Sequence, residues 1–590
     1  MTCAYEFELD ARSREERELR PDDPGVEDGV WTCPHEAVDG RERCRFHCPP
    51  PPGGDDRVDR LLDRVETPET ADRHDRERRR QFVGALFDGV TLRDLVISGP
   101  DLATIDLRHC EIRGDLRIER TTCDHLLDLS GATIYGETEV DTATFRRGLW
   151  ASGATFKKSV RFSRTDVTGE AEFARTTLED GAVFTEAAFD IGPNFELADS
   201  DAALEFDGSD FGPRRDANFR GCTVADDLGF RNVTAASNLV LKRITVGAGL
   251  SFERAHIDAS VRITIREPPD ADVPDGPRTY AFDGAWIDSV DVRLGETAAD
   301  QYLSFDDATV DGGRIGFPAD ESAVVDVRDA TLGDVRFDPT TTADSRSPLE
   351  HVFFLRTDFD GFDFTDTTLP FDRTPAALPR LTAGCAEIVL RADERKAREL
   401  AETAEETAVE TGPDVDYRDM IATYLKAKTG ADEAGAGRLA GSFYRWEMAY
   451  RRRLAVARLR TYVTDEQMRP RRRLTRGALT LGGLVENRLL GATTAYGESP
   501  IRVVGWMLVT VAAFGAFFAL VGAETGVSVG GSVGSQLLLS AQVFVSVFLG
   551  APPGDGDVSS AVAVASTVEG FLGALLVALF VFTLTRRVHR

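Results

Sequence analysis

Bulky apolar residues recur at a constant spacing through the middle of the chain. Eleven positions separate neighbours in two series, which are Phe162, Phe173, Phe184, Phe195 and Phe206, and then Phe219, Phe230, Leu241 and Phe252. Further apolar residues, such as Phe189 and Phe211, fall five or six positions between them. This repeat predicts a solenoid, because a single turn cannot bury its apolar edge unless the next turn stacks on it.

The repeat length alone does not separate helix from strand, since eleven residues are also close to three turns of an α-helix. The composition of the region favours strands. It is rich in Phe, Thr, Val, Asp and Gly, and these residue types are typical of strands and tight turns. We therefore predict short strands separated by tight corners, in a parallel β-helix over residues 85–366.

The repeating units share a small residue two positions before the bulky one. Examples are Ala143-Thr-Phe-Arg-Arg, Ala154-Thr-Phe-Lys-Lys and Ala171-Glu-Phe-Ala-Arg. They resemble the Ala-x-Phe/Leu-x-x units of the pentapeptide-repeat family, although the five-residue phase slips to six about every second unit. The resemblance implies a β-solenoid that acts as a scaffold or spacer, or as an acidic rod that binds a protein partner in the cytoplasm or mimics a polyanion such as a nucleic acid.

Two apolar runs near the C-terminus, residues 501–522 and 561–585, are long enough to cross a bilayer. A third run, residues 534–550, is shorter and precedes a turn rich in Pro and Gly. Arginines cluster before the first run and after the last, and residues 503–585 contain no Lys or Arg. Positive flanks mark the cytoplasmic side of a membrane. We therefore expect a multi-pass protein of the cell membrane with both termini in the cytoplasm, and hence a re-entrant middle helix.

The order of span, re-entrant helix and span resembles the two-span potassium-channel-like pore family over residues 491–590. The stretch from Thr567 to Gly573 is similar to the inner helix of that family, with Gly570 and Gly573 near a bend. The resemblance implies a homo-oligomer, in the family's case a tetramer, that conducts K⁺ or another monovalent cation. The filter position departs from the family, since Ser546-Val-Phe-Leu-Gly550-Ala-Pro-Pro keeps one glycine and has Ala-Pro in place of Tyr-Gly.

Three carboxylates are further candidates for the pore. Rings of Asp555 and Asp557 would provide weak cation selectivity in place of a carbonyl filter. Glu569 is the one acidic residue inside the last apolar run, and it either faces ions or bonds to the re-entrant helix. The sequence thus predicts a monovalent-cation channel or a degenerate, non-selective relative. The alternative is a non-conducting, membrane-anchored interaction scaffold.

The first 52 residues contain a cluster of Cys and His. Thiolate and imidazole ligands suit a tetrahedral Zn²⁺ that holds together a segment with little core of its own. The preferred ligands are Cys3, Cys33, Cys44 and His47, and the alternates are His35 and Cys48. The competing interpretation is a set of reduced cysteines without a metal. A charged linker with a helical arm follows over residues 53–84.

Residues 367–490 have the periodicity of helices, with a Gly-containing turn at residues 430–437 that predicts an α-hairpin. The trio Arg445, Trp446 and Glu447 lies in the second helix, followed by further arginines. This connector is expected to couple the solenoid to the first span. The alternative is a passive linker whose arginines contact anionic lipid headgroups.

The charge of the chain restricts its partners. The net charge is −30, and sixty-three arginines stand against only six lysines, which is typical of salt-adapted, halophilic proteins. No nucleic-acid partner is expected, because neutralising phosphates needs a basic surface. The sequence shows no phosphate-binding loop, nucleophile elbow or paired histidine motif, so we do not expect an enzyme. The predicted fold is therefore multidomain: a parallel β-solenoid, a helical connector and a two-span module with a re-entrant helix.

Overall fold

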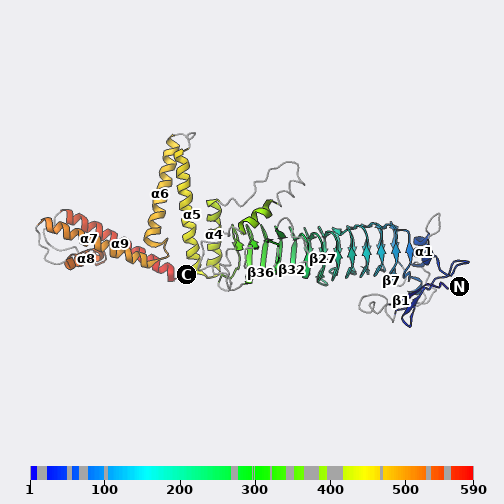
Figure 1. The fold of residues 1–590 in the computed structure, drawn as a ribbon. Helices are drawn as coiled ribbons and strands as arrows, with labels where there is room; N and C mark the ends of the chain where they lie inside the picture. Colours follow the sequence, from blue (N-terminus) through cyan, green and yellow to red (C-terminus); the bar gives the residue numbers. More distant parts are fainter. Residues whose placement is uncertain are drawn as a thin grey trace. The chain divides into compact units, whose positions relative to one another are not determined.

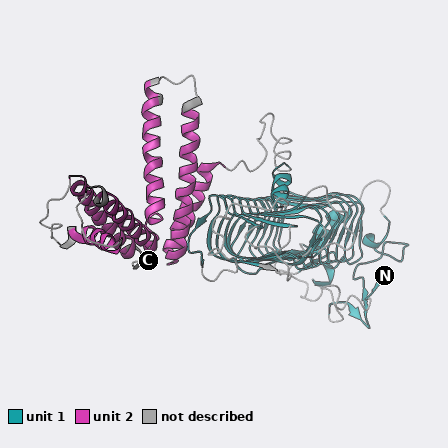
Figure 2. Cartoon of the chain, turned by 60° about the vertical axis from the view of Figure 1, so that its left-hand side comes forward, with its two compact units in different colours: residues 1–370, 377–414 teal, residues 371–376, 415–590 magenta. Residues whose placement is uncertain are grey.

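The chain divides into two compact units, which Figure 2 colours separately. Unit 1 comprises residues 1–370 and 377–414, and unit 2 comprises residues 371–376 and 415–590. A computed structural model describes residues 2–9, 23–49, 56–65, 77–98, 104–266, 277–295, 297, 299–318, 322–340, 351–364, 385–394, 416–464, 470–525, 533–549 and 560–588.

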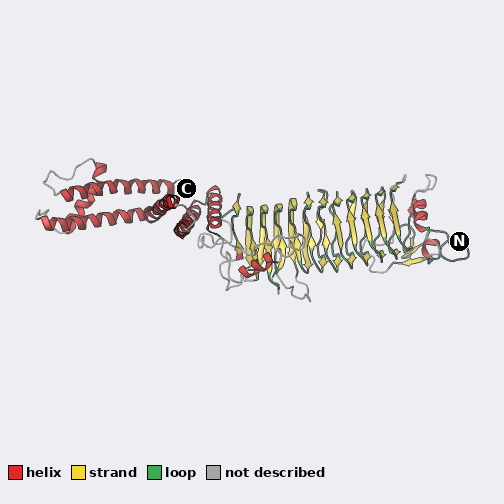
Figure 3. Ribbon diagram, turned by 90° about the horizontal axis from the view of Figure 1, so that it is seen from above, coloured by secondary structure: helices red, strands yellow, loops and turns green. Residues whose placement is uncertain are grey.

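Unit 1 is built around a parallel β-solenoid, whose coils stack as successive rungs in Figures 1 and 3. Strands that are neighbours in a sheet come from consecutive coils. One such sheet contains β5 (Val90–Arg93), β9 (Leu116–Glu119), β13 (Thr138–Asp141), β17 (Val160–Ser163), β21 (Ala182–Thr185), β24 (Leu204–Glu205), β28 (Leu228–Gly229), β31 (Gly249–Ser251), β33 (Arg278–Ala281), β35 (Gln301–Ser304), β37 (Ala323–Asp326) and β39 (Val352–Phe353). This architecture, followed by helices that include two candidate membrane spans, confirms the predicted fold class.

The eleven-residue spacing corresponds to half a coil. Phe162 of β17 pairs with Phe184 of β21, so alternate members of the series lie in separate interior columns. Phe184 stacks on Phe206 with ring centroids 4.9 Å apart, and Phe173 stacks on Phe195 at the same distance. Rings of the two columns meet edge to face, as Phe173 and Phe184 do at 5.7 Å. These are the arrangements that aromatic quadrupoles favour, so the repeat fills the interior with an ordered stack.

Corner residues of successive coils adopt the left-handed conformation. Thr142, Arg164 and Glu186 have φ values of 53°, 49° and 51° and occupy equivalent corners. The conformation costs an L-residue roughly 1–2 kcal/mol. The next coil satisfies the corner amides, since Arg164 N–H donates to the Thr185 carbonyl at 2.9 Å. Stacking therefore stabilises a corner that a single coil would not hold.

The strands lengthen toward the C-terminal end of the solenoid. The long strands are β30 (Leu239–Val246), β32 (His256–Ile265), β34 (Trp286–Arg293), β36 (Thr309–Pro318) and β38 (Thr331–Thr340). The equivalent N-terminal strands are short, as β7 (Thr104–Asp106) and β27 (Thr223–Val224) show. The left-handed corner residue persists in β30 as Arg243, with φ of 58°, and has no counterpart in β32, so this corner is lost from β32 onward. The eleven-residue spacing fades in the same region, after Phe252.

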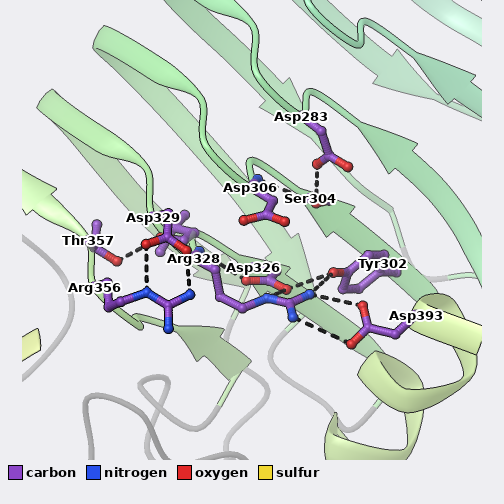
Figure 4. A network of polar contacts seen from close by, with 11 residues as sticks. Asp283, Tyr302, Ser304, Asp306, Asp326, Arg328, Asp329, Arg356, Thr357 and Asp393 are labelled. Carbon is purple, nitrogen blue, oxygen red and sulfur yellow. Dashed lines mark hydrogen bonds and ion pairs between the residues drawn. The ribbon is translucent and has the colours of Figure 1, made fainter. Parts of the chain in front are cut away.

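A helix of residues 385–394 packs on the solenoid within unit 1, and its apolar side chains bury Tyr302. Figure 4 shows the polar network beneath it. Arg328 donates from Nε to Asp326 at 2.7 Å and from Nη2 to Asp393 of the helix at 3.0 Å. The Tyr302 hydroxyl donates to Asp326 at 2.6 Å. A buried carboxylate is thus paired with an arginine that also holds the helix.

The N-terminal segment of unit 1 is a small antiparallel sheet with two short helices. Its elements are β1 (Glu6–Glu8), β2 (Val26–Glu27), β3 (Val30–Thr32), the 3₁₀-helix η1 (Arg45–His47) and α1 (Arg57–Val65). Trp31 of β3 is fully buried. Its indole N–H donates to Gln81, which lies just before the first coil strand β4 (Leu86–Phe87). The segment therefore packs on the beginning of the solenoid.

Unit 2 is helical. It contains α4 (Tyr417–Glu433), α5 (Gly437–Thr464), α6 (Pro470–Thr494), α7 (Pro500–Thr525), α8 (Val533–Leu549) and α9 (Ser560–Val588). Asp416 caps α4 through the backbone N–H groups of Arg418 and Asp419. Helices α4 and α5 pack together, with Tyr424 stacked on Tyr450 at 5.7 Å.

Candidate metal centre and membrane module

Four predicted ligands meet at one point in the N-terminal segment. The ligand atoms of Cys3, Cys33, Cys44 and His47 all lie within 4.8 Å of one another, and all four residues are buried. The Cys33 and Cys44 sulfurs are 3.8 Å apart, and His47 Nδ1 is 3.6 Å from the Cys3 sulfur and 3.1 Å from the Cys44 sulfur. Zn–S bonds of about 2.3 Å in a tetrahedron would place neighbouring sulfurs about 3.8 Å apart. The donor set and most of its spacing therefore fit Zn²⁺.

Local structure brings these ligands together. Cys3 lies just before β1 and Cys33 just after β3, and these two strands are paired. Cys44 begins η1 and His47 ends it, so one short helical turn supplies two ligands. The Cys44 backbone N–H also donates to the Cys3 sulfur at 3.1 Å, which orients that thiolate.

His47 is held in one tautomer by the solenoid. Its Nε2 lies 2.9 Å from the carbonyl oxygen of Val83, which can only accept a proton. The Nε2–H group therefore donates to Val83, and the Nδ1 lone pair faces the thiols. The Tyr5 ring stacks on the imidazole with centroids 3.8 Å apart. An imidazole oriented by a backbone carbonyl on its far side is typical of metal-ligating histidines.

Hydrogen bonds within the cluster shift the pKa values of its three thiols in different directions. Hydrogen bonds from Cys33 and Cys44 hold the pKa of the Cys3 thiol far below its usual range. The bond that Cys33 donates to Cys3 raises the pKa of Cys33, and the bond to Cys3 likewise raises the pKa of Cys44 to about 11. Zn²⁺ requires its sulfur ligands as thiolates, so metal binding would displace the protons that these hydrogen bonds share.

The two alternate ligands point elsewhere. His35 Nε2 bonds to the Gln81 carbonyl oxygen at 2.9 Å, and its ring stacks on Phe82. Burial lowers the pKa of His35 to about 4, so the ring is neutral. The Cys48 thiol donates to the Arg43 carbonyl at 3.5 Å. His35 thereby joins the segment to the residues that precede the first coil, and both residues lie outside the four-residue cluster.

The sequence gives no sign of the hydrogen bonds by which two buried arginines hold this segment together and join it to the first coil. Buried Arg57 of α1 donates to the carbonyl oxygens of Leu86 and Cys48, and buried Arg80 donates to the Val65 carbonyl. Backbone carbonyls are acceptors at every residue, so only the fold reveals which ones are used. Arg57 lies in the predicted charged arm, where its burial was not expected.

The membrane module contains two helices that are long and apolar enough to cross a bilayer, Pro500–Val521 within α7 and Ser560–Thr585 within α9. The shorter α8 packs against both of them. Glycines allow the close approach: a Cβ at Gly515 of α7 would lie 2.9 Å from Leu537, and one at Gly573 of α9 would lie 2.3 Å from the Phe544 carbonyl oxygen. Both Leu537 and Phe544 belong to α8.

A single hydroxyl connects all three helices. Ser540 of α8 has its Oγ 2.9 Å from the Val511 carbonyl oxygen of α7 and in hydrogen-bonding contact with Glu569 of α9. Glu569 is fully buried in the chain. The sequence left two roles for Glu569, which were facing ions and bonding to the re-entrant helix. Within one chain, Glu569 bonds to α8, the predicted re-entrant helix.

The structure says less about the remaining pore candidates. Ser546 donates to the Val543 carbonyl of its own helix at 2.7 Å, and Gly570 is buried on α9 beside Glu569. Gly550, Asp555 and Asp557 lie outside the described residues. The sequence did not predict the contacts of Ser540, because a serine within an apolar run does not indicate which residue it bonds to.

Comparisons with known proteins bear on the solenoid alone. The family model for pentapeptide repeats (9 copies) matches residues 118–166. No curated protein and no solved structure matches the chain. The matched residues run from β9 to the beginning of β18 (Asp166–Val167), where the coils are most regular. Residues 118–166 are therefore a segment of pentapeptide repeats, within a longer parallel β-solenoid.

Proposed function

We propose that the chain is one subunit of a channel-like integral membrane protein. In this proposal α7 and α9 span the bilayer, α8 is re-entrant, and several copies surround a pore for monovalent cations. The solenoid lies in the cytoplasm and serves as a scaffold or sensor that a protein partner can bind. The observation that carries the proposal is the docking of the short apolar α8 on both long apolar helices, through Gly515, Ser540 and Gly573.

The outer surfaces of these helices support membrane insertion and assembly. Large apolar side chains of α7 and α9, among them Leu508, Leu520 and Phe571, are mostly exposed. Water would not stabilise such surfaces, whereas lipid or neighbouring subunits would. A re-entrant helix also needs protein around it, which favours a homo-oligomer.

Recording from purified protein in planar bilayers tests the channel. We expect cation currents that scale with protein added; no conductance at any salt concentration or voltage would contradict the proposal. Two variants then separate the roles of Glu569. If its carboxylate acts by holding α8, Glu569→Gln and the matched Ser540→Ala should change the currents alike. If it faces ions, only Glu569→Gln should change the cation-to-anion permeability ratio.

A non-conducting, membrane-anchored scaffold is the second candidate. The observation that favours it is Ala551-Pro552-Pro553 at the filter position, since proline restricts the backbone that a carbonyl filter requires. These residues lie outside the described structure. An oligomer that inserts into vesicles and passes no current would support the scaffold over the channel.

We also propose that Zn²⁺ binds the cluster of Cys3, Cys33, Cys44 and His47. The support is the convergence of four buried ligand atoms and the orientation of His47 by Val83. Metal analysis after dialysis against a weak chelator should give about one zinc per chain in the natural protein. Cys44→Ser should lose it, and the matched Cys48→Ser should keep it. Metal-free protein of unchanged stability would contradict a structural zinc.

A further inference from the structure

Helices α5 and α6 concentrate positive charge in an acidic chain. α5 contains seven arginines and α6 contains five, against one glutamate in each, whereas the net charge of the whole chain is −30. The glutamate of α5, Glu447, already pairs with Arg451 at 2.7 Å. Together the two helices contain twelve arginines and two glutamates, so their own side chains carry ten more positive than negative charges.

Four of these arginines line one groove. Arg452, Arg453 and Arg460 of α5 face Arg488 of α6 around a cavity of about 270 Å³. The other lining residues are Tyr417, Val456, Ala457 and Leu484. Among the described residues, none that lines the groove carries a carboxylate. Guanidinium groups around an apolar floor suit a ligand that combines a phosphate with hydrocarbon.

An apolar stripe runs along α6 beside the groove. Every residue of this stripe is large, apolar and between 49% and 77% exposed: Leu474, Leu481, Val485 and Leu489. Their spacing of seven, four and four places them on one side of the helix, and Leu479 and Leu490, which are 78% and 42% exposed, lie on the opposite side. A neighbouring side of α6 contacts α5, where the Asn487 side chain donates to the Met448 carbonyl at 3.3 Å. The stripe therefore has no cover from α5.

The C-terminal end of α6 is fastened to the beginning of the first span. The Trp506 indole N–H of α7 donates to the Ala492 carbonyl at 3.0 Å, and Arg502 donates to the Gly491 carbonyl at 3.2 Å. The two helices are separated by five residues, from Ala495 to Ser499. If α7 crosses the membrane from this end, the last turns of α6 must lie at the membrane surface.

We propose that α6 lies in the membrane interface, with its apolar stripe at the boundary of headgroups and acyl chains and the arginine groove on the phosphate of an anionic lipid. Basic amphipathic helices bind membranes through this combination of buried apolar area and attraction to anionic lipid. The inference rests on the proposed function in one respect, which is that α7 is a membrane span. It adds a lipid-binding site to the helix that connects α5 to that span.

The test places a polarity-sensitive fluorophore on single added cysteines of the full chain in vesicles of phosphatidylcholine and phosphatidylglycerol. Leu481→Cys reports on the stripe. Arg476→Cys is the control, because five residues of helix turn the side chain by about 140° from Leu481 and Arg476 is exposed. Leu508→Cys reports on insertion of α7. The eight natural cysteines are buried, and the unsubstituted chain gives the labelling background.

We expect a blue-shifted emission at positions 481 and 508 that brominated lipid quenches, and a water-like emission at position 476. Emission typical of lipid at position 508 together with emission typical of water at position 481 would overturn the inference and leave the membrane span intact. A water-like 508 would instead contradict the span itself. A blue-shifted 481 that brominated lipid does not quench would mean that a second copy covers the stripe, which also overturns the inference.

The groove is tested by lipid selectivity. Brominated phosphatidylglycerol should quench position 481 more than brominated phosphatidylcholine does, and Arg453→Gln with Arg488→Gln should reduce this preference roughly five-fold or more. Arg438→Gln, on α5 outside the groove, is the matched control. Inorganic phosphate at constant ionic strength should leave the preference unchanged. Loss of the preference on adding phosphate would show a site for free anions and overturn the assignment to lipid.

Discussion

The solenoid and the membrane module both contain many large apolar residues, but they bury them differently. Phe184 in the solenoid is 1% exposed because the coils before and after it are part of the same chain. Phe571 on α9 is 70% exposed in the single chain. The solenoid is therefore complete as one molecule, whereas the outer surfaces of α7 and α9 require lipid or another subunit. Removing the same side chain should therefore change the free energy of unfolding by different amounts in the two regions.

The largest expected effect separates these two phenylalanines. Phe184→Ala should destabilise the solenoid by about 3–5 kcal/mol, because it removes a buried ring between two others. Phe571→Ala should change stability by only about 0.5 kcal/mol, as at an exposed position. Thermal unfolding in vesicles, followed by circular dichroism in the β-sheet region, measures the first; equal losses in the two variants would contradict the comparison.

Within the membrane module, the contact of α8 with α9 should be the most sensitive to added volume. Gly573→Ala should cost about 1–3 kcal/mol, because the new Cβ would lie 2.3 Å from the Phe544 carbonyl oxygen. Gly505→Ala on α7 is the control, since its Cβ would meet nothing within 4 Å. Resistance of the purified protein to denaturation in detergent reports the difference. Equal behaviour of the two alanine variants would argue against close packing of α8.

The smallest expected effect concerns pH at the N-terminal end of the solenoid. Burial lowers the pKa of His109, whose ring stacks on Phe7, to about 4. The neutral ring contributes stability that is present above about pH 6.5 and is lost as pH falls from there through about pH 4. The loss at pH 6 should be about 1 kcal/mol. His109→Phe should remove about half of the pH dependence when hydrogen exchange of β1 is followed between pH 8 and pH 6, because buried His35 of the same segment, whose pKa is also lowered to about 4, contributes similarly. An unchanged dependence would assign it to other groups.

The sequence was most informative where structure repeats. The spacing of Phe162 through Phe206 predicted stacked coils, because identical half-coils must bury identical positions. It did not predict the lengthening of the strands from β30 onward or the loss of a corner from β32 onward. That change depends on how each coil fits its neighbour, which local residue preferences do not encode.

Residue chemistry was also informative where it is unusual. Cys and His within a short segment predicted the four residues that converge, although spacing alone did not exclude His35 or Cys48. The partners that orient those ligands, such as the Val83 carbonyl, are backbone atoms without a sequence pattern. The hydroxyl of Ser540 is a similar case, since its contacts with α7 and α9 depend on tertiary packing.

The re-entrant course of α8 is the central claim, and the sidedness of its two flanking helix ends tests it directly. Single cysteines at Thr525, the end of α7, and at Ser560, the beginning of α9, are reacted with a membrane-impermeant thiol reagent in intact cells. If α8 enters and leaves on the same side, both positions should react from outside. Reaction at one position and protection of the other would mean that α8 crosses the membrane, which would contradict the two-span arrangement and the pore built on it.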